Sequence, residues 1–175
     1  KSSRGLGDVY KRQMKTNVDG TRYVLDACEK HGVKRMIHVS SATVAEDLPW
    51  SEHYDETRRL RDPSTATPYE YSKMLSEDIV RERAKSGGVE AVIVRPSGLI
   101  GTPDLRGAAV CRTVQELFLG KMKFVMTGGY DFVDARDVAD GILSAIDKGV
   151  NGETYLLTGK PVSYTHLRAH ETTCD

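Results

Sequence analysis

Two short runs of branched apolar residues constrain the fold of this chain more than any other feature. The first, VKRMIHVS at 33–40, and the second, VEAVIVR at 89–95, match buried strands in length and in β-branched content. A third strand is predicted at 153–157. Helical patterns accompany these strands, over residues 16–31, 67–85, 108–119 and 138–148. Helices that alternate with short apolar strands predict βαβ units, so we expect an α/β fold with a parallel sheet.

The first predicted helix is amphipathic. It runs from Thr16 to His31, and Gly32 follows as a stop signal. We expect Cys28 to pack on its apolar side. The other apolar residues predicted for the buried face are Val18, Tyr23, Val24, Leu25 and Ala27.

The composition excludes several classes of protein. The 175 residues carry 25 basic and 25 acidic side chains, so the formal net charge is zero. Proteins that bind nucleic acids or membrane surfaces usually show a basic excess, and we expect neither partner. No apolar run approaches the about 20 residues of a membrane span. The three cysteines lack metal-binding or disulfide spacing, which favours a reducing, cytoplasmic location.

The two ends of the sequence are related through their coding strands. Residues 3–13 (SRGLGDVYKRQ) can be encoded so that the reverse complement, read from its third base, translates as VSYTHLRAHE. That string is residues 162–171 of the same chain. The pattern resembles the adapter of transposase-based sequencing libraries, read through at both ends of an insert. We therefore expect both ends to be adapter-derived, with no part in the core, and both natural termini to be missing.

This interpretation divides the chain into four parts. Residues 1–13 and 161–175 are the adapter-derived ends. Residues 14–101 are expected to form the main α/β unit, and residues 102–160 a smaller subdomain that returns to the sheet. A polar segment at 45–67 is long for a loop in a compact domain, and loops of that length are usually functional.

Tyr69 and Lys73 form the first candidate site. They are four residues apart at the start of a predicted helix and therefore share a face. An ammonium beside a phenol favours the phenolate, which lowers the phenol pKa from about 10 and suits a tyrosine to general acid/base catalysis. The spacing alone is common on surface helices, so the assignment depends on its surroundings.

Ser40 and Ser41 end a buried strand, where parallel-sheet enzymes place their ligand sites. A serine hydroxyl there can hydrogen-bond a substrate oxygen, or it can serve a cap or a turn. Asn17 lies at the predicted start of the first helix, where an N-cap or first-turn role is the simplest interpretation.

Five segments together resemble the extended type of the short-chain dehydrogenase/reductase superfamily. They are TNVDGT at 16–21, HVSSATV at 38–44, PYEYSK at 68–73, RPSGLIG at 95–101 and FVDARDVADG at 132–141. Their order and spacing are similar to those of the NAD-dependent epimerase/dehydratase family, and GGYDFVDARDVADGI resembles its dihydroflavonol-reductase-like branch. The resemblance implies a partial Rossmann-like parallel sheet with helices on its faces and part of a small C-terminal substrate subdomain.

The resemblance implies roles for the matching residues only. Tyr69 would be the catalytic acid/base, and Lys73 would lower its pKa and hydrogen-bond the nicotinamide ribose. Ser41, rather than its neighbour Ser40, aligns with the serine that polarises the substrate oxygen. Asn17 matches the asparagine that completes a tetrad in other members. The segment that packs beside the nicotinamide ring corresponds to Pro96 and Ser97.

These roles imply an NAD(P)-dependent oxidoreductase or epimerase/dehydratase. Hydride would move between the nicotinamide and a hydroxyl- or carbonyl-bearing carbon of a small-molecule substrate, and the branch favours a simple carbonyl reductase. A non-catalytic dinucleotide-binding regulator or scaffold of the same fold is the alternative, although such proteins usually lose the tyrosine or the lysine.

The family's glycine-rich phosphate loop has no counterpart here, because no G-x-x-G-x-x-G follows a strand in this sequence. The residue that selects NAD or NADP is missing with it. We therefore expect an incomplete and inactive piece of an enzyme whose parent can be a homodimer.

Other polar residues receive simpler interpretations. His31 and His38 are isolated, one at a helix end and one in a strand, and no ligand role is expected for either. Trp50, His53 and Tyr54 lie in the long polar segment and are candidates to touch substrate. Three aspartates suit helix capping and a solvated face better than a metal site, namely Asp134, Asp137 and Asp140.

Overall fold

The computed structural model describes residues 6–47, 49, 54–101, 107, 109–119, 121 and 129–163. The chain divides into two compact units. The first comprises Lys1–Arg95 and Ile142–Leu156, and the second comprises Pro96–Gly141 and Leu157–Asp175. The described strands form two three-stranded sheets.

The sheet of the first unit contains the strands that the sequence predicts. β1 (Arg35–Val39) and β2 (Glu90–Pro96) are parallel, with Met36 opposite Ala91 and Val39 opposite Val94. β5 (Thr154–Leu157) lies on the other side of β2, so β1 is an edge strand of this sheet. The predicted α/β fold with a parallel sheet is confirmed.

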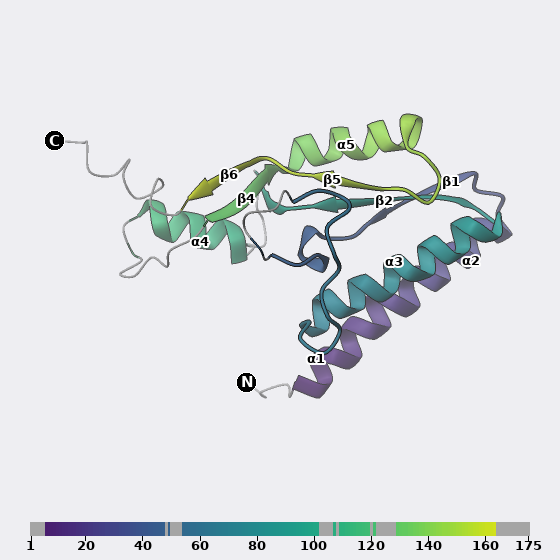
Figure 1. Ribbon diagram of the computed structural model, residues 1–175, viewed down its shortest axis with the longest axis horizontal. Helices are drawn as coiled ribbons and strands as arrows, with labels where there is room; N and C mark the ends of the chain where they lie inside the picture. Colours follow the sequence, from purple (N-terminus) through teal and green to yellow (C-terminus); the bar gives the residue numbers. More distant parts are fainter. Residues whose placement is uncertain are drawn as a thin grey trace. The chain divides into compact units, whose positions relative to one another are not determined.

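The helix α3 (Pro68–Ser86) begins and ends where its sequence signals stand. Thr67 and Glu70 form a reciprocal capping box, in which each side chain accepts from the other residue's backbone N–H. Gly87 ends the helix at φ 79°, a left-handed conformation that favours glycine. α3 and α2 (Gly20–Lys30) lie side by side along the sheet (Figure 1).

The first helix starts earlier than the predicted Thr16. α1 (Leu6–Gln13) runs into a π-helical segment (Met14–Asp19), which continues into α2 without a break in helical backbone. No residue near Thr16 interrupts the helix, because no proline is present and the side chain of Asn17 does not cap a helix end. Residues 7–12 are exposed along α1.

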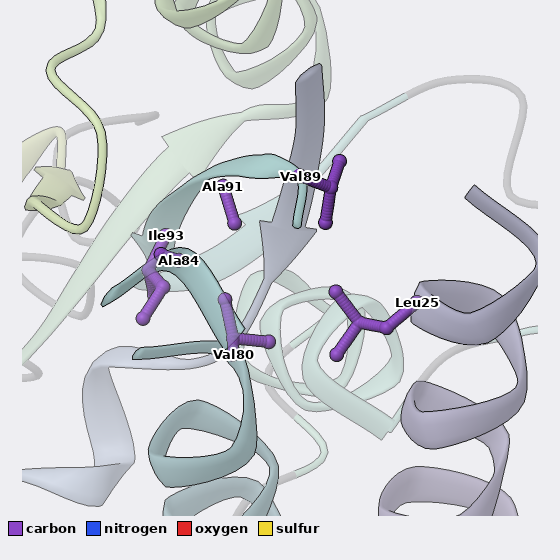
Figure 2. Close-up of a cluster of buried hydrophobic side chains, with 6 residues drawn as sticks. All are labelled: Leu25, Val80, Ala84, Val89, Ala91 and Ile93. Atoms are coloured by element: carbon purple, nitrogen blue, oxygen red, sulfur yellow. The ribbon is translucent and has the colours of Figure 1, made fainter. Parts of the chain in front are cut away.

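The core of the first unit lies between α2, α3 and β2 (Figure 2). Its fully or nearly fully buried residues are Leu25, Val80, Ala84, Val89, Ala91 and Ile93. Cys28 packs against this cluster, as predicted. Successive strand residues face opposite sides of a sheet, and Val92 accordingly points away from the cluster toward Gly149, at the end of α5 (Ala135–Lys148).

The predicted apolar face of the first helix is only partly correct. Val18 and Leu25 are buried, but Ala27 is exposed, and Tyr23 and Val24 keep 69% and 52% of their surface exposed. The helix has one side against α3 and β2, and no described residue covers the adjoining side. Apolar periodicity identifies residues that can be buried, whereas burial also requires a partner.

We expect this chain to self-associate when it is produced alone. β1 is an edge strand, and Tyr23 and Val24 expose apolar surface on the helix beside it. Exposed apolar side chains next to an open strand edge favour aggregation. Light scattering should therefore detect oligomers, and Tyr23→Glu should reduce them.

The matched control for this effect is Leu143→Glu on α5. Leu143 is 60% exposed, but its helix lies on the other side of the sheet from α2. The added charge is of the same kind and should lower the scattering less. A monodisperse monomer of the unmodified chain would contradict the prediction.

The second unit contains a mixed sheet and α4 (Ala109–Phe118). β3 (Gly98–Ile100) is parallel to β4 (Gly129–Asp134), and β6 (Lys160–Ser163) is antiparallel to β4. β6 includes the first residues of the end that is expected to be adapter-derived, and Val162 pairs with Tyr130 at the edge of this sheet. An open strand edge offers unpaired backbone groups that any extended segment can satisfy.

Among the described residues, no helix combines the length and the apolar character that a membrane span requires.

Candidate active site

The end of β1 places two serines beside α3. Ser40 is buried, and its backbone N–H donates to the carbonyl of Val94 at 2.8 Å. Ser41 caps a short 3-10 turn (Ala42–Val44), and its Oγ accepts from the backbone N–H of Thr43 at 3.3 Å. This turn lies against α3. Ser41 therefore has the capping role that its position allows, and its half-buried hydroxyl stands at the carboxyl end of a parallel strand.

Tyr69 and Lys73 occupy the first two turns of α3. Tyr69 is 40% exposed. Lys73 is half-buried, and its Nζ donates to the carbonyl oxygen of Val39 at 2.8 Å. Burial lowers the pKa of Lys73, although the carboxylate of Glu77 opposes this effect. The bond to Val39 holds the predicted lysine to the strand that ends in the two serines.

Asn17 is not an N-cap residue, in contrast to the simplest interpretation of its position. It lies within the π-helical segment, and its Nδ2 donates to Gln13 Oε1 and to Ser72 Oγ, each at 2.9 Å. The hydroxyl of Ser72 in turn donates to the backbone carbonyl of Tyr69 at 2.8 Å. Asn17 is thereby connected to the first turn of α3 through one buried serine.

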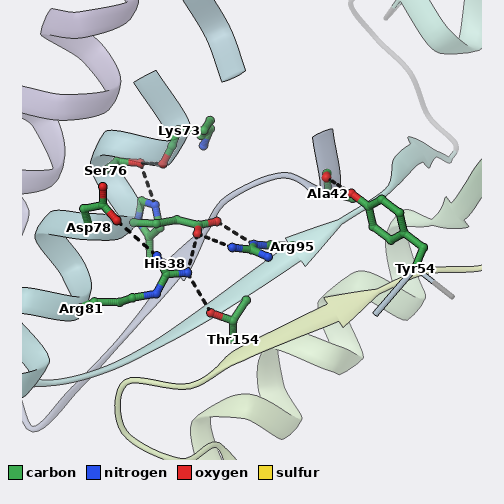
Figure 3. A network of polar contacts seen from close by, with 10 residues as sticks. His38, Ala42, Tyr54, Lys73, Ser76, Asp78, Arg81, Arg95 and Thr154 are labelled. Atoms are coloured by element: carbon green, nitrogen blue, oxygen red, sulfur yellow. Dashed lines mark hydrogen bonds and ion pairs between the residues drawn. The ribbon is translucent and has the colours of Figure 1, made fainter. Parts of the chain in front are cut away.

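His38 has a comparable link to α3. It is therefore not isolated, although its position in the sequence suggests that it is. Its Nε2 lies 3.1 Å from Ser76 Oγ (Figure 3). The hydroxyl of Ser76 donates to the backbone carbonyl of Lys73 at 2.8 Å. Burial and the nearby Lys73 ammonium lower the pKa of His38 to about 4, so the ring is neutral at pH 7.

A buried ion pair lies next to this link. Arg95 donates from Nε and Nη2 to the two carboxylate oxygens of Glu77, at 2.9 and 2.6 Å. Glu77 is 0% exposed and Arg95 is 2% exposed. Arg81 adds a second guanidinium, at 2.7 Å from Glu77 and 3.3 Å from Thr154 Oγ1 (Figure 3). Burial alone would raise the pKa of Glu77, but the bonds to Arg95 lower it overall.

The described part of the long polar segment is held by two arginines. Arg58 is buried and donates to the carbonyl oxygens of Glu46 and Pro49 at 3.0 and 2.8 Å. Arg61 donates to the carbonyl of Thr43 at 2.7 Å and pairs with Asp47. The segment is therefore anchored to the turn that follows Ser41.

Tyr54 is the described member of the three candidates in this segment. Its hydroxyl donates to the carbonyl oxygen of Ala42, next to Ser41 (Figure 3). Burial, with the charge of Asp47, raises the pKa of Tyr54, so its hydroxyl stays protonated at pH 7. Trp50 and His53 lie outside the described residues.

A cavity of about 320 Å³ lies between α2 and β1. Asn17, Val24, His38 and Lys73 are among the residues that line it. An ammonium supplies hydrogen-bond donors and a carboxamide oxygen supplies an acceptor for hydroxyl groups, and the aliphatic wall suits the edge of a ring. Asn17 and Lys73, two candidate site residues from the sequence, therefore line the same cavity.

The remaining candidates have structural contacts. Pro96 and Ser97 belong to the second unit, where Ser97 Oγ donates to Asp131 and the Ser97 N–H donates to the carbonyl of Leu157 at 3.1 Å. Asp134 accepts from the backbone N–H of Arg136 at 2.8 Å, as expected for a helix cap. His31 is exposed at the end of α2. Within the described ranges, no group of His, Cys, Asp and Glu side chains is placed to hold a metal ion.

Comparison with known proteins identifies the family of this arrangement. The model of the NAD-dependent epimerase/dehydratase family matches residues 9–158. The chain belongs to this family. A similar protein, sterol demethylase protein B of Methylococcus capsulatus, is 36% identical over 148 residues, which are 82% of this chain and 43% of that protein. The family predicted from the sequence is confirmed.

Two further comparisons agree. A putative dihydroflavonol 4-reductase of Synechocystis sp. is 28% identical, over 91% of this chain and 47% of its own length. The crystal structure of a nucleoside-diphosphate-sugar epimerase from Pseudomonas aeruginosa superimposes with a TM-score of 0.78 at 27% identity, over 89% of this chain and 51% of that one. The chain therefore spans about half the length of the relatives it matches.

The epimerase/dehydratase motifs in the sequence did not predict the hydrogen bonds and ion pairs that lie behind the site. Two signals could have indicated them. Arg95 ends an apolar strand that is otherwise buried, and a charge there needs a partner. Glu77 lies among buried α3 positions three residues from Met74 and from Val80, so it is placed to supply that partner.

Proposed function

We propose that the protein carrying this chain is an NAD(P)-dependent oxidoreductase or epimerase/dehydratase that acts through Ser41, Tyr69 and Lys73. The single observation that carries this proposal is the bond from Lys73 Nζ to the carbonyl of Val39. It joins the tyrosine–lysine face of α3 to the strand whose end bears Ser41. The chemistry then needs no other acid/base group than Tyr69.

The residues present suit one end of a nicotinamide dinucleotide. Lys73 and Asn17 border the cavity between α2 and β1, where the Lys73 ammonium would supply a donor and the Asn17 amide oxygen an acceptor for ribose hydroxyls. The sequence supplies no glycine-rich loop for the diphosphate, so this chain alone lacks the phosphate cradle. We infer that the 175 residues are inactive by themselves and that they carry the catalytic half of a cytoplasmic enzyme, which can be a homodimer.

The bound nicotinamide would supply or accept the hydride at a hydroxyl- or carbonyl-bearing carbon. Ser41 would donate a hydrogen bond to the substrate oxygen and hold it in place. Tyr69 would transfer the proton to or from that oxygen. Lys73, fixed on Val39, would place its ammonium beside the cavity and hydrogen-bond the nicotinamide ribose.

The substrate class follows from the relatives rather than from the site. The names sterol demethylase protein B and dihydroflavonol 4-reductase both belong to proteins associated with fused-ring alcohols or ketones. We propose a ring-borne secondary alcohol or ketone as substrate, with reduction of a simple carbonyl compound as the reaction to assay first.

The decisive experiment follows deuterium from the nicotinamide to the product. The full-length protein should transfer deuterium from NADH or NADPH labelled at C4 to the carbinol carbon of a reduced ketone or aldehyde. The 175-residue chain alone should transfer none. Nucleotide binding without transfer to any substrate of a broad panel would favour the non-catalytic scaffold instead, and turnover by the isolated chain would refute its inactivity.

A further inference from the structure

Two buried serines on α3 have matching positions relative to the proposed catalytic residues. Ser72 follows Tyr69 by three residues, and its hydroxyl donates to the Tyr69 carbonyl at 2.8 Å. Ser76 follows Lys73 by three residues, and its hydroxyl donates to the Lys73 carbonyl at 2.8 Å. Both serines are 0% exposed. Each hydroxyl therefore has its proton bonded and keeps lone pairs that can accept a further hydrogen bond.

Those partners come from other elements. Ser72 accepts from Asn17 of the π-helical segment at 2.9 Å. Ser76 lies 3.1 Å from Nε2 of His38, which belongs to β1. A serine hydroxyl has one proton, and the proton of Ser76 goes to the Lys73 carbonyl. Nε2 of His38 must then supply the proton of the second bond, which requires the neutral ring to be protonated at Nε2.

The strand and the helix are thus joined in both directions. The side chain of His38 reaches from β1 to Ser76, and the side chain of Lys73 reaches back from α3 to the carbonyl of Val39, the next residue of β1. Neither bond can form if α3 slides or rotates along the strand. His38 also lines the cavity that Lys73 borders.

We propose that His38 and Ser76 are positioning residues, which hold the backbone of Lys73 so that its ammonium stays at the edge of β1 beside the cavity. This role rests on the proposed function, because Lys73 is there the group that binds the nicotinamide ribose. Neutral His38 suits the role better than a lysine or arginine, since a second cation would repel the ammonium of Lys73. A misplacement of about 1 Å can cost roughly 10²-fold in rate, so a small shift of α3 is enough to matter.

The first test concerns the proton and needs no turnover. In the full-length protein labelled with ¹⁵N-histidine, long-range ¹H–¹⁵N correlation at pH 7 should show His38 protonated at Nε2. The signal is assigned by its loss in His38→Leu. Ser76→Ala removes the acceptor and should change the tautomer ratio. Protonation at Nδ1 in the unmodified protein would overturn the proposal, whatever the protein catalyses.

The second test measures positioning. His38→Leu keeps the volume and removes the donor, and Ser76→Ala breaks the chain. Each should weaken nicotinamide nucleotide binding and lower kcat by roughly 10–10²-fold, with little change in KM for the carbonyl substrate. His38→Gln returns an N–H donor near the Nε2 position and should restore most of both. The thermal midpoints should differ little among the His38 variants.

Ser86→Ala is the matched control. Ser86 lies on the same helix and also donates to a carbonyl three residues back, that of Arg83, at 2.8 Å, but it is exposed and far along α3 from Lys73. This variant should bind and react like the unmodified protein. If Ser86→Ala and Ser76→Ala lose binding and kcat equally, or if His38→Gln restores neither, then His38 and Ser76 contribute only to packing and the positioning role is refuted. Activity that persists in Tyr69→Phe would instead refute the proposed function and leave the tautomer result intact.

Discussion

Replacing Tyr69 by phenylalanine should lower kcat of the full-length protein by about 10²–10⁴-fold. A carbonyl that receives hydride becomes an alkoxide, which needs a proton. Tyr69 is the proton donor that the family pattern places in the first turn of α3, next to Lys73. Phenylalanine keeps the ring and removes the proton, so the loss should appear in kcat rather than in substrate KM. Steady-state reduction of aldehydes and ketones with NADH and NADPH measures it.

Tyr71→Phe is the control for the Tyr69 experiment. Tyr71 lies on the same turn of α3, but two positions along a helix point to different sides. It is half-buried beside Pro68 and Ala66, in a pocket of the first unit separate from the one that Lys73 borders. This variant should retain its rate. Equal kcat in Tyr69→Phe and the unmodified protein would refute the mechanism, and a loss confined to Tyr71→Phe would move the acid/base role to that residue.

Local signals in the sequence were sufficient for the frame of the first unit. Thr67 and Glu70 indicate the start of α3, and Gly87 indicates its end, because capping depends on residues within one turn of each other. The two β-branched runs predict β1 and β2, because β-branched residues favour strands, although β2 alone of the two is buried and β1 is a half-exposed edge strand. These features require no knowledge of distant parts of the chain.

The errors concern contacts between distant segments. The exposure of Tyr23 and Val24 depends on what covers α2, and periodicity does not report that. The link from Asn17 to Ser72 crosses 55 positions, and the link from His38 to Ser76 crosses 38. A histidine in a strand therefore looks isolated until the fold brings α3 beside it. The family pattern pointed to Asn17, but the interpretation as an N-cap assigned it a local partner.

Neutralising Glu77 should strongly destabilise the first unit. Glu77→Gln leaves the guanidinium of Arg95, which is 2% exposed, without its carboxylate. Breaking a buried pair by removing one charge costs about 3–5 kcal/mol. Urea unfolding of the full-length protein should show this decrease in the free energy of unfolding.

Two comparisons separate the lost charge from general damage. Asp19→Asn breaks the exposed pair with Arg22, whose side chains are 46% and 53% exposed, and should cost about 0–1 kcal/mol. Replacing Glu77 and Arg95 together by methionine removes both charges and should recover most of the loss, because the desolvation cost disappears with the pair. A Glu77→Gln protein as stable as the unmodified one would contradict the expected cost.

The pH dependence of stability gives an independent measure of the same pair. The pKa of Glu77 in the folded protein lies below its ordinary value of 4.5. The folded state therefore binds fewer protons than the unfolded state in this range, and the stabilisation by Glu77 is present above pH 4.5 and is lost as the pH falls through the folded pKa. The pKa of His38 is lowered from 6.5 to about 4, so stability that depends on neutral His38 is also lost as the pH falls. This loss occurs in a higher pH range, between pH 6.5 and 4. The loss of stability on acidification above pH 4.5 should thus remain in Glu77→Gln and disappear in His38→Gln. The loss of stability below pH 4.5 should disappear in Glu77→Gln and remain in His38→Gln.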